Sequence, residues 1–142
     1  MAREKYIVDT NVFLRYVLAD NVNQYKLVKN FFGKASKRKI DLILVAQVVF
    51  EMEYVLRILY KKEKREIVDM FKSILSWEWL IIREGGEILK RTISLFKDTN
   101  VSLVDCYLSV VAKNEKAEVF SFDNRPPHSI KVKPERVGAD KV

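Results

Sequence analysis

Short apolar segments alternate along this chain with longer segments in which apolar residues recur at helical spacing. Strands are predicted for the short segments, at residues 6–8, 42–45, 79–82 and 119–122, with a fifth edge strand near Val132 or Val137. Strands separated by helices are typical of a mostly parallel sheet, because parallel strands need a long crossover connection. We therefore predict an α/β fold: a three-layer α/β/α sandwich with a mostly parallel four- or five-stranded sheet.

Helices are predicted between these strands. Their expected ranges are residues 12–18, 24–33, 47–60, 67–75, 87–96 and 102–114. The chain has 142 residues, of which 49% are hydrophobic, four are Gly and three are Pro. Such a composition favours one folded domain over residues 1–142 with short connections.

Cysteine content and the length of apolar runs indicate the cellular location of the protein. Its one cysteine, Cys106, excludes an intramolecular disulfide. No apolar run approaches the roughly 20 residues that cross a bilayer, and no signal peptide is recognised. We therefore expect a cytoplasmic protein with no membrane partner.

The charge balance favours a polyanionic partner. Lys and Arg number 26 against 19 Asp and Glu, which gives a net charge of +7. An excess of this size on a small domain points to RNA or DNA before other ligands, although many basic proteins bind no nucleic acid.

Two acids, Asp9 and Asp123, follow predicted strands directly. Ligands of parallel sheets bind beyond the carboxyl ends of the strands, so both acids belong to the expected functional edge. Each also has a structural explanation. Asp9 is a suitable N-cap for the following helix, and Asp123 is suited to a turn before the two prolines.

Two further acids, Glu51 and Asp105, lie in predicted helices that are apolar on most sides. Glu51 is explained equally well by the solvated stripe of an amphipathic helix. Asp105 lies three residues after Ser102, the spacing of a capping box. A carboxylate buried in so apolar a helix, however, needs a cation or hydrogen bonds.

Four clustered carboxylates would repel one another unless a cation neutralised them. Oxygen ligands select Mg²⁺ or Mn²⁺ rather than zinc. The chain has a single His, His128, and a single Cys, which also excludes a Ser-His-Asp or Cys-His nucleophile arrangement.

Four stretches resemble a known family. They are residues 6–15 (YIVDTNVFLR), Glu51 in a long apolar helix, residues 104–108 (VDCYL) and residues 119–123 (VFSFD). In order and spacing, nearly the whole chain resembles the PIN-domain family, and most of all its VapC-type toxins. The motifs DTN and SFD are weak separately and fairly specific in combination.

The resemblance implies a metal-dependent endoribonuclease that prefers single-stranded RNA, often a toxin paired with a small antitoxin and usually a homodimer. In that family four acids hold one or two Mg²⁺ or Mn²⁺ ions, supported by polar residues. The matching residues are Asp9, Glu51, Asp105 and Asp123, with Thr10, Asn11 and Ser121 in support.

Basic residues near the acids are candidates for binding substrate phosphates. Arg15 and Arg125 are the nearest in sequence. Two lysine- and arginine-rich runs, at residues 34–39 and 61–65, are better explained as solvated helix ends. Trp77 and Trp79 suggest either a homodimer surface or part of the core.

Three other functions share part of this pattern. A haloacid-dehalogenase-like phosphatase needs a second Asp where this chain has Asn11, and a response-regulator receiver domain needs an acidic pair where it has Asp9 alone. A non-catalytic PIN-like RNA-binding or assembly module is the third. A degenerate module is expected to lose acids, and all four are present.

Overall fold

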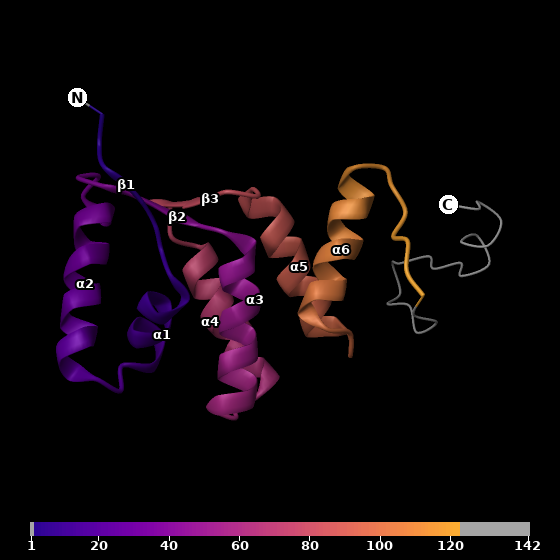
Figure 1. Ribbon diagram of the computed structural model, residues 1–142, viewed down its shortest axis with the longest axis horizontal. Coiled ribbons are helices and arrows are strands. Elements are labelled where there is room, and N and C mark those ends of the chain that lie inside the picture. The colour runs from indigo at the N-terminus through magenta and orange to yellow at the C-terminus, as the bar shows by residue number, and fades with distance from the viewer. Residues whose placement is uncertain (1, 123–142) are drawn as a thin grey trace. The chain divides into compact units, whose positions relative to one another are not determined.

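The structure is a computed structural model that describes residues 2–122. The chain forms two compact units, Met1–Leu89 and Lys90–Val142. The boundary falls inside helix α5, and Figure 1 shows the elements of both units in chain order. The prediction of a single domain over residues 1–142 stays a prediction.

The first unit contains a parallel sheet of three strands. They are β1 (Lys5–Ile7), β2 (Asp41–Leu44) and β3 (Leu80–Ile82). β2 lies between the other two, and the register aligns Ile7 with Ile43 and Ile43 with Ile81. Because the strands are parallel, the segments that follow all three begin at the same edge of the sheet. The predicted α/β class and parallel sheet are confirmed.

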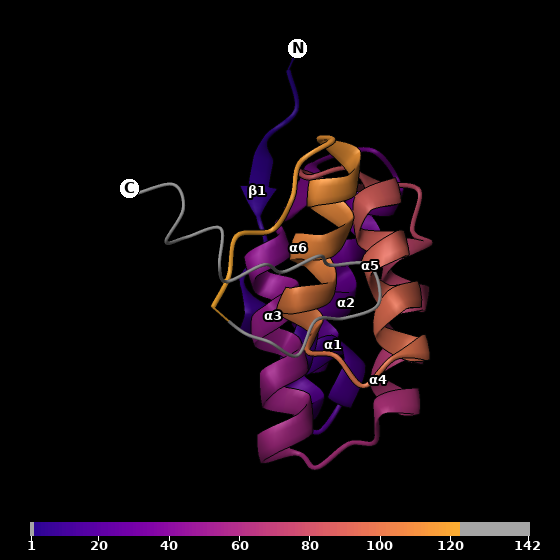
Figure 2. The same cartoon turned by 90° about the vertical axis from the view of Figure 1, so that its right-hand side faces the viewer.

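The helices of the first unit lie on one side of the strands (Figures 1 and 2). They are α1 (Thr10–Leu18), α2 (Val22–Ser36), α3 (Ala46–Tyr54), the π-helical segment η1 (Val55–Leu59) and α4 (Lys64–Leu75). α1 packs against both α2 and α3. In α4 the buried residues Ile67, Phe71 and Ile74 recur at helical spacing, as the sequence predicted.

The two faces of the sheet differ in exposure. Leu42 and Leu80, which are aligned across β2 and β3, are 0% and 6% exposed. Ile7 and Ile81 point to the opposite face and are 69% and 42% exposed. The helices α1 to α4 therefore cover the face that carries Leu42 and Leu80.

The long helix predicted over residues 47–60 changes type partway. After Tyr54 the backbone becomes π-helical, and the Tyr60 N–H donates to the Val55 carbonyl, five residues earlier, at 3.2 Å. Glu53 is buried at the transition and binds Arg57, with 2.6 Å between Oε2 and Nε. No Gly or Pro marks this transition in the sequence, so helical periodicity alone could not predict it.

Aromatic rings from α1, α2 and the turn before β3 form a cluster around Phe32. Its ring centroid lies 5.1 Å from that of Tyr16, 5.4 Å from Trp77 and 5.5 Å from Trp79. The two tryptophan rings stack at 4.9 Å. Both tryptophans are half-buried and contribute to packing within one chain, and their part in a homodimer surface stays a prediction.

The second unit contains most of α5 (Gly86–Asp98) and all of α6 (Leu103–Asn114). The two helices lie side by side in both views (Figures 1 and 2). Ile93 and Phe96 of α5 are buried, as are Cys106 and Val110 of α6. Among residues 2–122, no helix combines the length and the apolar character needed to cross a membrane.

The fourth strand predicted at residues 119–122 is not formed, which corrects the expected strand count for the described part of the chain. These residues have no strand pairing, and Phe120 and Phe122 are 59% and 72% exposed. Their rings contact each other, with centroids 6.0 Å apart. An apolar run becomes a strand only when a neighbouring strand pairs with it, and the pattern alone does not supply that partner. The predicted fifth strand lies outside the described residues.

Candidate active site

Asp9 lies at the junction between β1 and α1. The Val8 N–H donates to the Ile43 carbonyl at 3.0 Å, which continues the sheet pairing up to the residue before Asp9. Asp9 is the N-cap of α1, and its Oδ1 accepts a hydrogen bond from the Thr10 N–H at 2.7 Å. The residue is exposed, so capping leaves Oδ2 available to a ligand.

Thr10 is the clearest anomaly beside this carboxylate. The residue is 2% exposed, and its hydroxyl has no hydrogen-bond partner within residues 2–122. Leaving a buried hydroxyl unsatisfied costs about 1–3 kcal/mol. A ligand or water that reaches the end of β1 would relieve this cost, so Thr10 marks the junction as a binding position.

Glu51 lies on the exposed side of α3, the helix against which α1 packs. Its carboxylate has no ion-pair or hydrogen-bond partner within residues 2–122. The neighbouring acid Glu53 is buried and bound to Arg57. Of these two acids of α3, Glu51 is therefore the one that is available to a cation.

Glu84 is an acidic residue at the carboxyl edge of the sheet that was not predicted from the sequence. It is the second residue after β3, as Asp9 is the second after β1. Its Oε1 accepts a hydrogen bond from the Ala46 N–H at 3.0 Å. Val45, the N-cap of α3, provides no side-chain cap, so Glu84 caps from another strand the helix that carries Glu51. The strand-end rule that selected Asp9 would have found Glu84.

Glu84→Ala is expected to destabilise the fold by about 1 kcal/mol, the usual cost of losing an N-cap, and to reduce RNA cleavage if α3 positions a catalytic acid. Urea unfolding and cleavage assays measure the two effects. Glu78→Ala is the matched control, since it removes an exposed acid six residues earlier. An unfolding free energy within 0.3 kcal/mol of wild type, on the order of the usual error, would contradict the capping role.

Asp105 lies in the first turn of α6, in the second unit. The Ser102 Oγ accepts from the Asp105 N–H at 3.2 Å, which caps the helix. The reciprocal bond from the Ser102 N–H to the Asp105 carboxylate is not formed, so the capping box is incomplete. The carboxylate is half-buried and has no cationic partner within the described residues.

The remaining predicted residues complete the placement. Asp9 and Glu51 belong to the first unit, whereas Asp105 and Ser121 belong to the second, where Ser121 is half-buried. Asp123, Arg125 and His128 lie outside the described residues. Over residues 2–122, no three His, Cys, Asp or Glu side chains are placed together to hold a metal. The convergence of the four acids therefore stays a prediction.

Arg15 is fixed in place by two partners. Its Nη1 donates to Asp20 Oδ1 at 2.9 Å and its Nη2 donates to the Tyr60 hydroxyl at 3.2 Å. The hydrogen bond to Tyr60, followed by the charge of Asp20, raises the pKa of Arg15 above its usual value. The guanidinium therefore remains charged at every relevant pH.

Most of the basic side chains in the two runs, residues 34–39 and 61–65, are more exposed than that of Arg15. Residues 34–39 precede β2, so they lie near the edge of the sheet opposite to Asp9, and their lysines and arginine are exposed. Lys61 and Arg65 are also exposed, beside the start of α4. These exposures agree with the reading of both runs as solvated helix ends.

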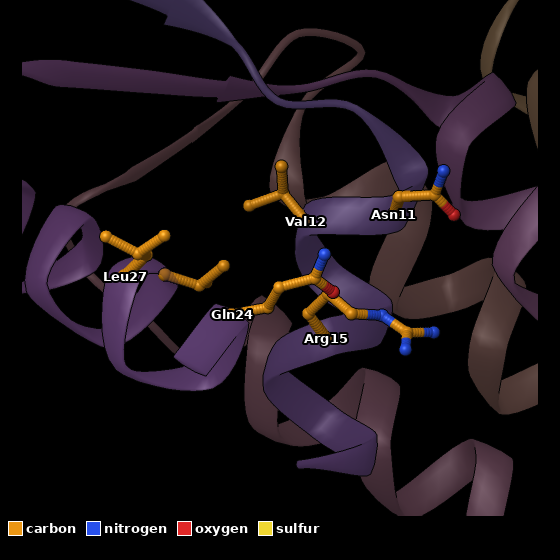
Figure 3. Close-up of a pocket in the computed structure, with 6 residues that line it drawn as sticks. Asn11, Val12, Arg15, Gln24 and Leu27 are labelled. Atoms are coloured by element: carbon orange, nitrogen blue, oxygen red, sulfur yellow. The ribbon is translucent and has the colours of Figure 1, made fainter. Parts of the chain in front are cut away.

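A groove of about 420 Å³ lies between α1 and α2. Three polar and three apolar residues line it: Asn11, Arg15 and Gln24, with Val12, Leu27 and Val28. Figure 3 shows Gln24 extending from α2 toward α1, where Arg15 lies. Asn11 is the second residue after Asp9, so the groove begins beside the end of β1. The sequence pattern did not predict Gln24, because its role depends on the packing of α2 against α1.

Comparisons with known proteins agree with the resemblance seen in the motifs. The PIN domain family matches residues 6–131. The VapC ribonuclease of Aquifex aeolicus (strain VF5) is 28% identical over 120 residues, which are 84% of this chain and 87% of that protein. The family match thus extends from β1 through α6.

Proposed function

Because the chain belongs to the PIN domain family, we propose that it is an endoribonuclease that hydrolyses phosphodiester bonds in single-stranded or structured RNA with the help of Mg²⁺ or Mn²⁺. The observation that carries the proposal is the end of β1, where an exposed Asp9 carboxylate lies next to the unpartnered, buried hydroxyl of Thr10. Similarity to a VapC ribonuclease supports RNA as the substrate.

The donor set fits a hard divalent cation. Asp9, Glu51 and Asp105 offer carboxylate oxygens, and none of the three has a cationic partner within residues 2–122. We propose that these residues and Asp123 hold the ion. When bound, it supplies positive charge that stabilises the charge developing on the phosphate. Carboxylate oxygens without His or Cys select Mg²⁺ or Mn²⁺ rather than zinc.

Each residue of the proposed active site has its own role. The Thr10 N–H orients Asp9 through Oδ1, so the other oxygen faces the ligand. Glu51 and Asp123 bind the ion directly or through water, or accept a proton during hydrolysis. Arg15 and Arg125 would bind the substrate as permanently charged guanidiniums.

The purified protein is expected to cut single-stranded RNA when Mg²⁺ or Mn²⁺ is added and to stop when excess chelator is present, because the carboxylates alone cannot neutralise the phosphate. Gel analysis of a labelled RNA measures the cleavage, and restoring the metal serves as the control for irreversible damage. Cleavage that persists in excess chelator would contradict the proposal. Metal-dependent binding of RNA without cleavage would instead favour a non-catalytic RNA-binding module.

We also propose that the protein is the toxin of a toxin–antitoxin pair, acting in the cytoplasm, with a small antitoxin as its partner. The similarity to a VapC ribonuclease supports this assignment. Expression of the chain alone should arrest growth, and Asp9→Asn should relieve the arrest; arrest that is unchanged by this substitution would contradict it. A homodimer is part of the same proposal. A light-scattering mass of 16.7 kDa at micromolar concentration, equal to the monomer, would remove it.

A further inference from the structure

The groove between α1 and α2 combines unpartnered polar groups with an apolar surface. Neither the Asn11 nor the Gln24 side-chain amide has a hydrogen-bond partner within residues 2–122. Each amide offers two donor hydrogens and one acceptor oxygen. Two such groups in one groove suit a ligand whose edge carries both donors and acceptors.

The third polar residue, Arg15, supplies a fixed planar cation. Asp20 and Tyr60 hold its guanidinium from the side of η1 and the end of α1. A guanidinium has five N–H donors, and the structure uses two of them for these bonds. Its remaining donors and its planar face are available to a ligand, and an arginine held in place loses little entropy on binding.

The apolar side of the groove is open to solvent at Leu27. Leu27 is 71% exposed although it lies among the groove residues, whereas Val28, the next residue of α2, is 9% exposed. Together with Val12 these side chains form a surface on which a flat, partly apolar ring can lie. Among the described residues, no acidic side chain lines the groove, and the nearby Asp20 carboxylate is paired with Arg15.

The position of the groove relates it to the proposed cleavage site. Asn11 is two residues beyond Asp9, which corresponds to a rise of about 3 Å along α1. Arg15 lies one helical turn farther on. Asn11 and Arg15 lie on the same face of α1, whereas residues two apart point to different sides, so the groove lies close to Asp9 along the helix rather than directly beside its carboxylate.

We propose that the α1–α2 groove binds one nucleobase of single-stranded RNA, near the phosphate that is cleaved; this rests on the proposed ribonuclease function. The amides of Asn11 and Gln24 would bind the hydrogen-bonding edge of the base, and Arg15 would stack on its ring or donate to it. The groove thereby sets a base preference next to the cleavage position. A protein segment is the competing occupant, and the net charge of +7 with two free amides favours RNA.

The test uses RNA binding with the metal removed, so cleavage plays no part. Four fluorescent RNA hexamers are compared by fluorescence anisotropy in excess chelator, each with A, C, G or U at the third position and uridine at the other five. Wild-type protein should prefer one central base by about tenfold, the scale of one good amide or guanidinium contact. Gln24→Ala should weaken binding of the preferred hexamer about fivefold to tenfold. The affinities for the four hexamers should then lie within about twofold of one another.

Two controls separate base recognition from charge and folding. Lys26→Ala removes an exposed charge of α2 outside the groove and should weaken the binding of all four hexamers equally. Asn23→Ala removes an amide one residue before Gln24 and should change nothing. Unfolding midpoints of the variants should equal that of the wild type, because all three residues are exposed.

Two results would overturn the inference. One is equal binding of the four hexamers by wild-type protein. The other is a Gln24→Ala variant that keeps the full preference, which would assign the groove to a protein partner instead. Protein that discriminates the bases but never cuts RNA with Mg²⁺ would contradict the proposed function and support the groove assignment. Protein that cuts RNA but binds all four hexamers equally would support the proposed function and contradict the groove assignment.

Discussion

Asp9→Asn is expected to reduce RNA cleavage by more than roughly 100-fold, since loss of a residue that merely supports a metal ligand costs 10- to 100-fold. The fold should survive, because Asn caps a helix as well as Asp does. The Asn amide oxygen can accept the Thr10 N–H in place of Oδ1. The substitution thus removes the negative charge and keeps the structural role. Initial rates on a labelled single-stranded RNA and urea unfolding measure the two properties.

Asp105→Asn should lower cleavage to the same degree, and its control is Ser102→Ala. The helix cap depends on the Ser102 hydroxyl, which accepts the Asp105 N–H. Ser102→Ala should therefore cost about 1 kcal/mol of stability and leave the cleavage rate near wild type. If Asp9→Asn or Asp105→Asn cuts RNA at the wild-type rate, the residue has no part in catalysis. An equal loss of activity in Ser102→Ala would show that helix stability, rather than the carboxylate, matters at α6.

Phe32→Ala should lower the free energy of unfolding by about 3–5 kcal/mol, the usual cost of truncating a buried Phe. The side chain is 4% exposed and lies at the centre of the aromatic cluster. It touches four rings, those of Phe13, Tyr16, Trp77 and Trp79. Domains are stable by only about 5–15 kcal/mol, so this loss is a large fraction of the whole.

Urea unfolding followed by tryptophan fluorescence measures this effect, because Trp77 and Trp79 stack within the same cluster. Val22→Ala is the control. Val22 is 64% exposed, and its truncation should change stability by less than about 0.5 kcal/mol. A Phe32→Ala variant that lost no more than this control would show that the cluster does not hold α2 against α1 and the turn before β3.

The parts of the fold that depend on local pattern were predictable from the sequence. Asp9 follows a short apolar run and precedes a helical one, and the structure places it at that junction as the N-cap of α1. The apolar spacing of α4 predicted its buried face. In both cases neighbouring residues in the chain determine the result, through strand alternation, helical periodicity and capping.

Features that depend on distant partners were not predictable in the same way. Glu84 caps α3 across 38 residues, and Arg15 reaches Tyr60 across 45. The π-helical segment at Val55–Leu59 has no breaker residue to mark it. The strand expected at residues 119–122 needed a partner that its own apolar pattern does not specify.

The candidate site also has features that the sequence predicted and features that only the structure shows. Chain position alone placed Asp9 at the carboxyl edge of the sheet, and the structure adds the unpartnered hydroxyl of Thr10 beside it. The sequence left Glu51 equally explained as a solvated residue, and the structure shows it exposed and unpaired within residues 2–122, while Glu53 is buried in an ion pair. Contrasts between neighbouring residues of one type appear only when burial and partners are known.

Binding of Mn²⁺ to the full-length protein tests the central claim most directly, because it requires neither the right RNA nor catalysis. Titration followed by electron paramagnetic resonance should show saturable binding to wild-type protein. Asp9→Asn and Asp105→Asn should each weaken this binding by more than roughly tenfold, while Asp69→Asn, an exposed acid of α4, should not. Undiminished Mn²⁺ binding by both site variants would contradict the assignment of these acids as metal ligands.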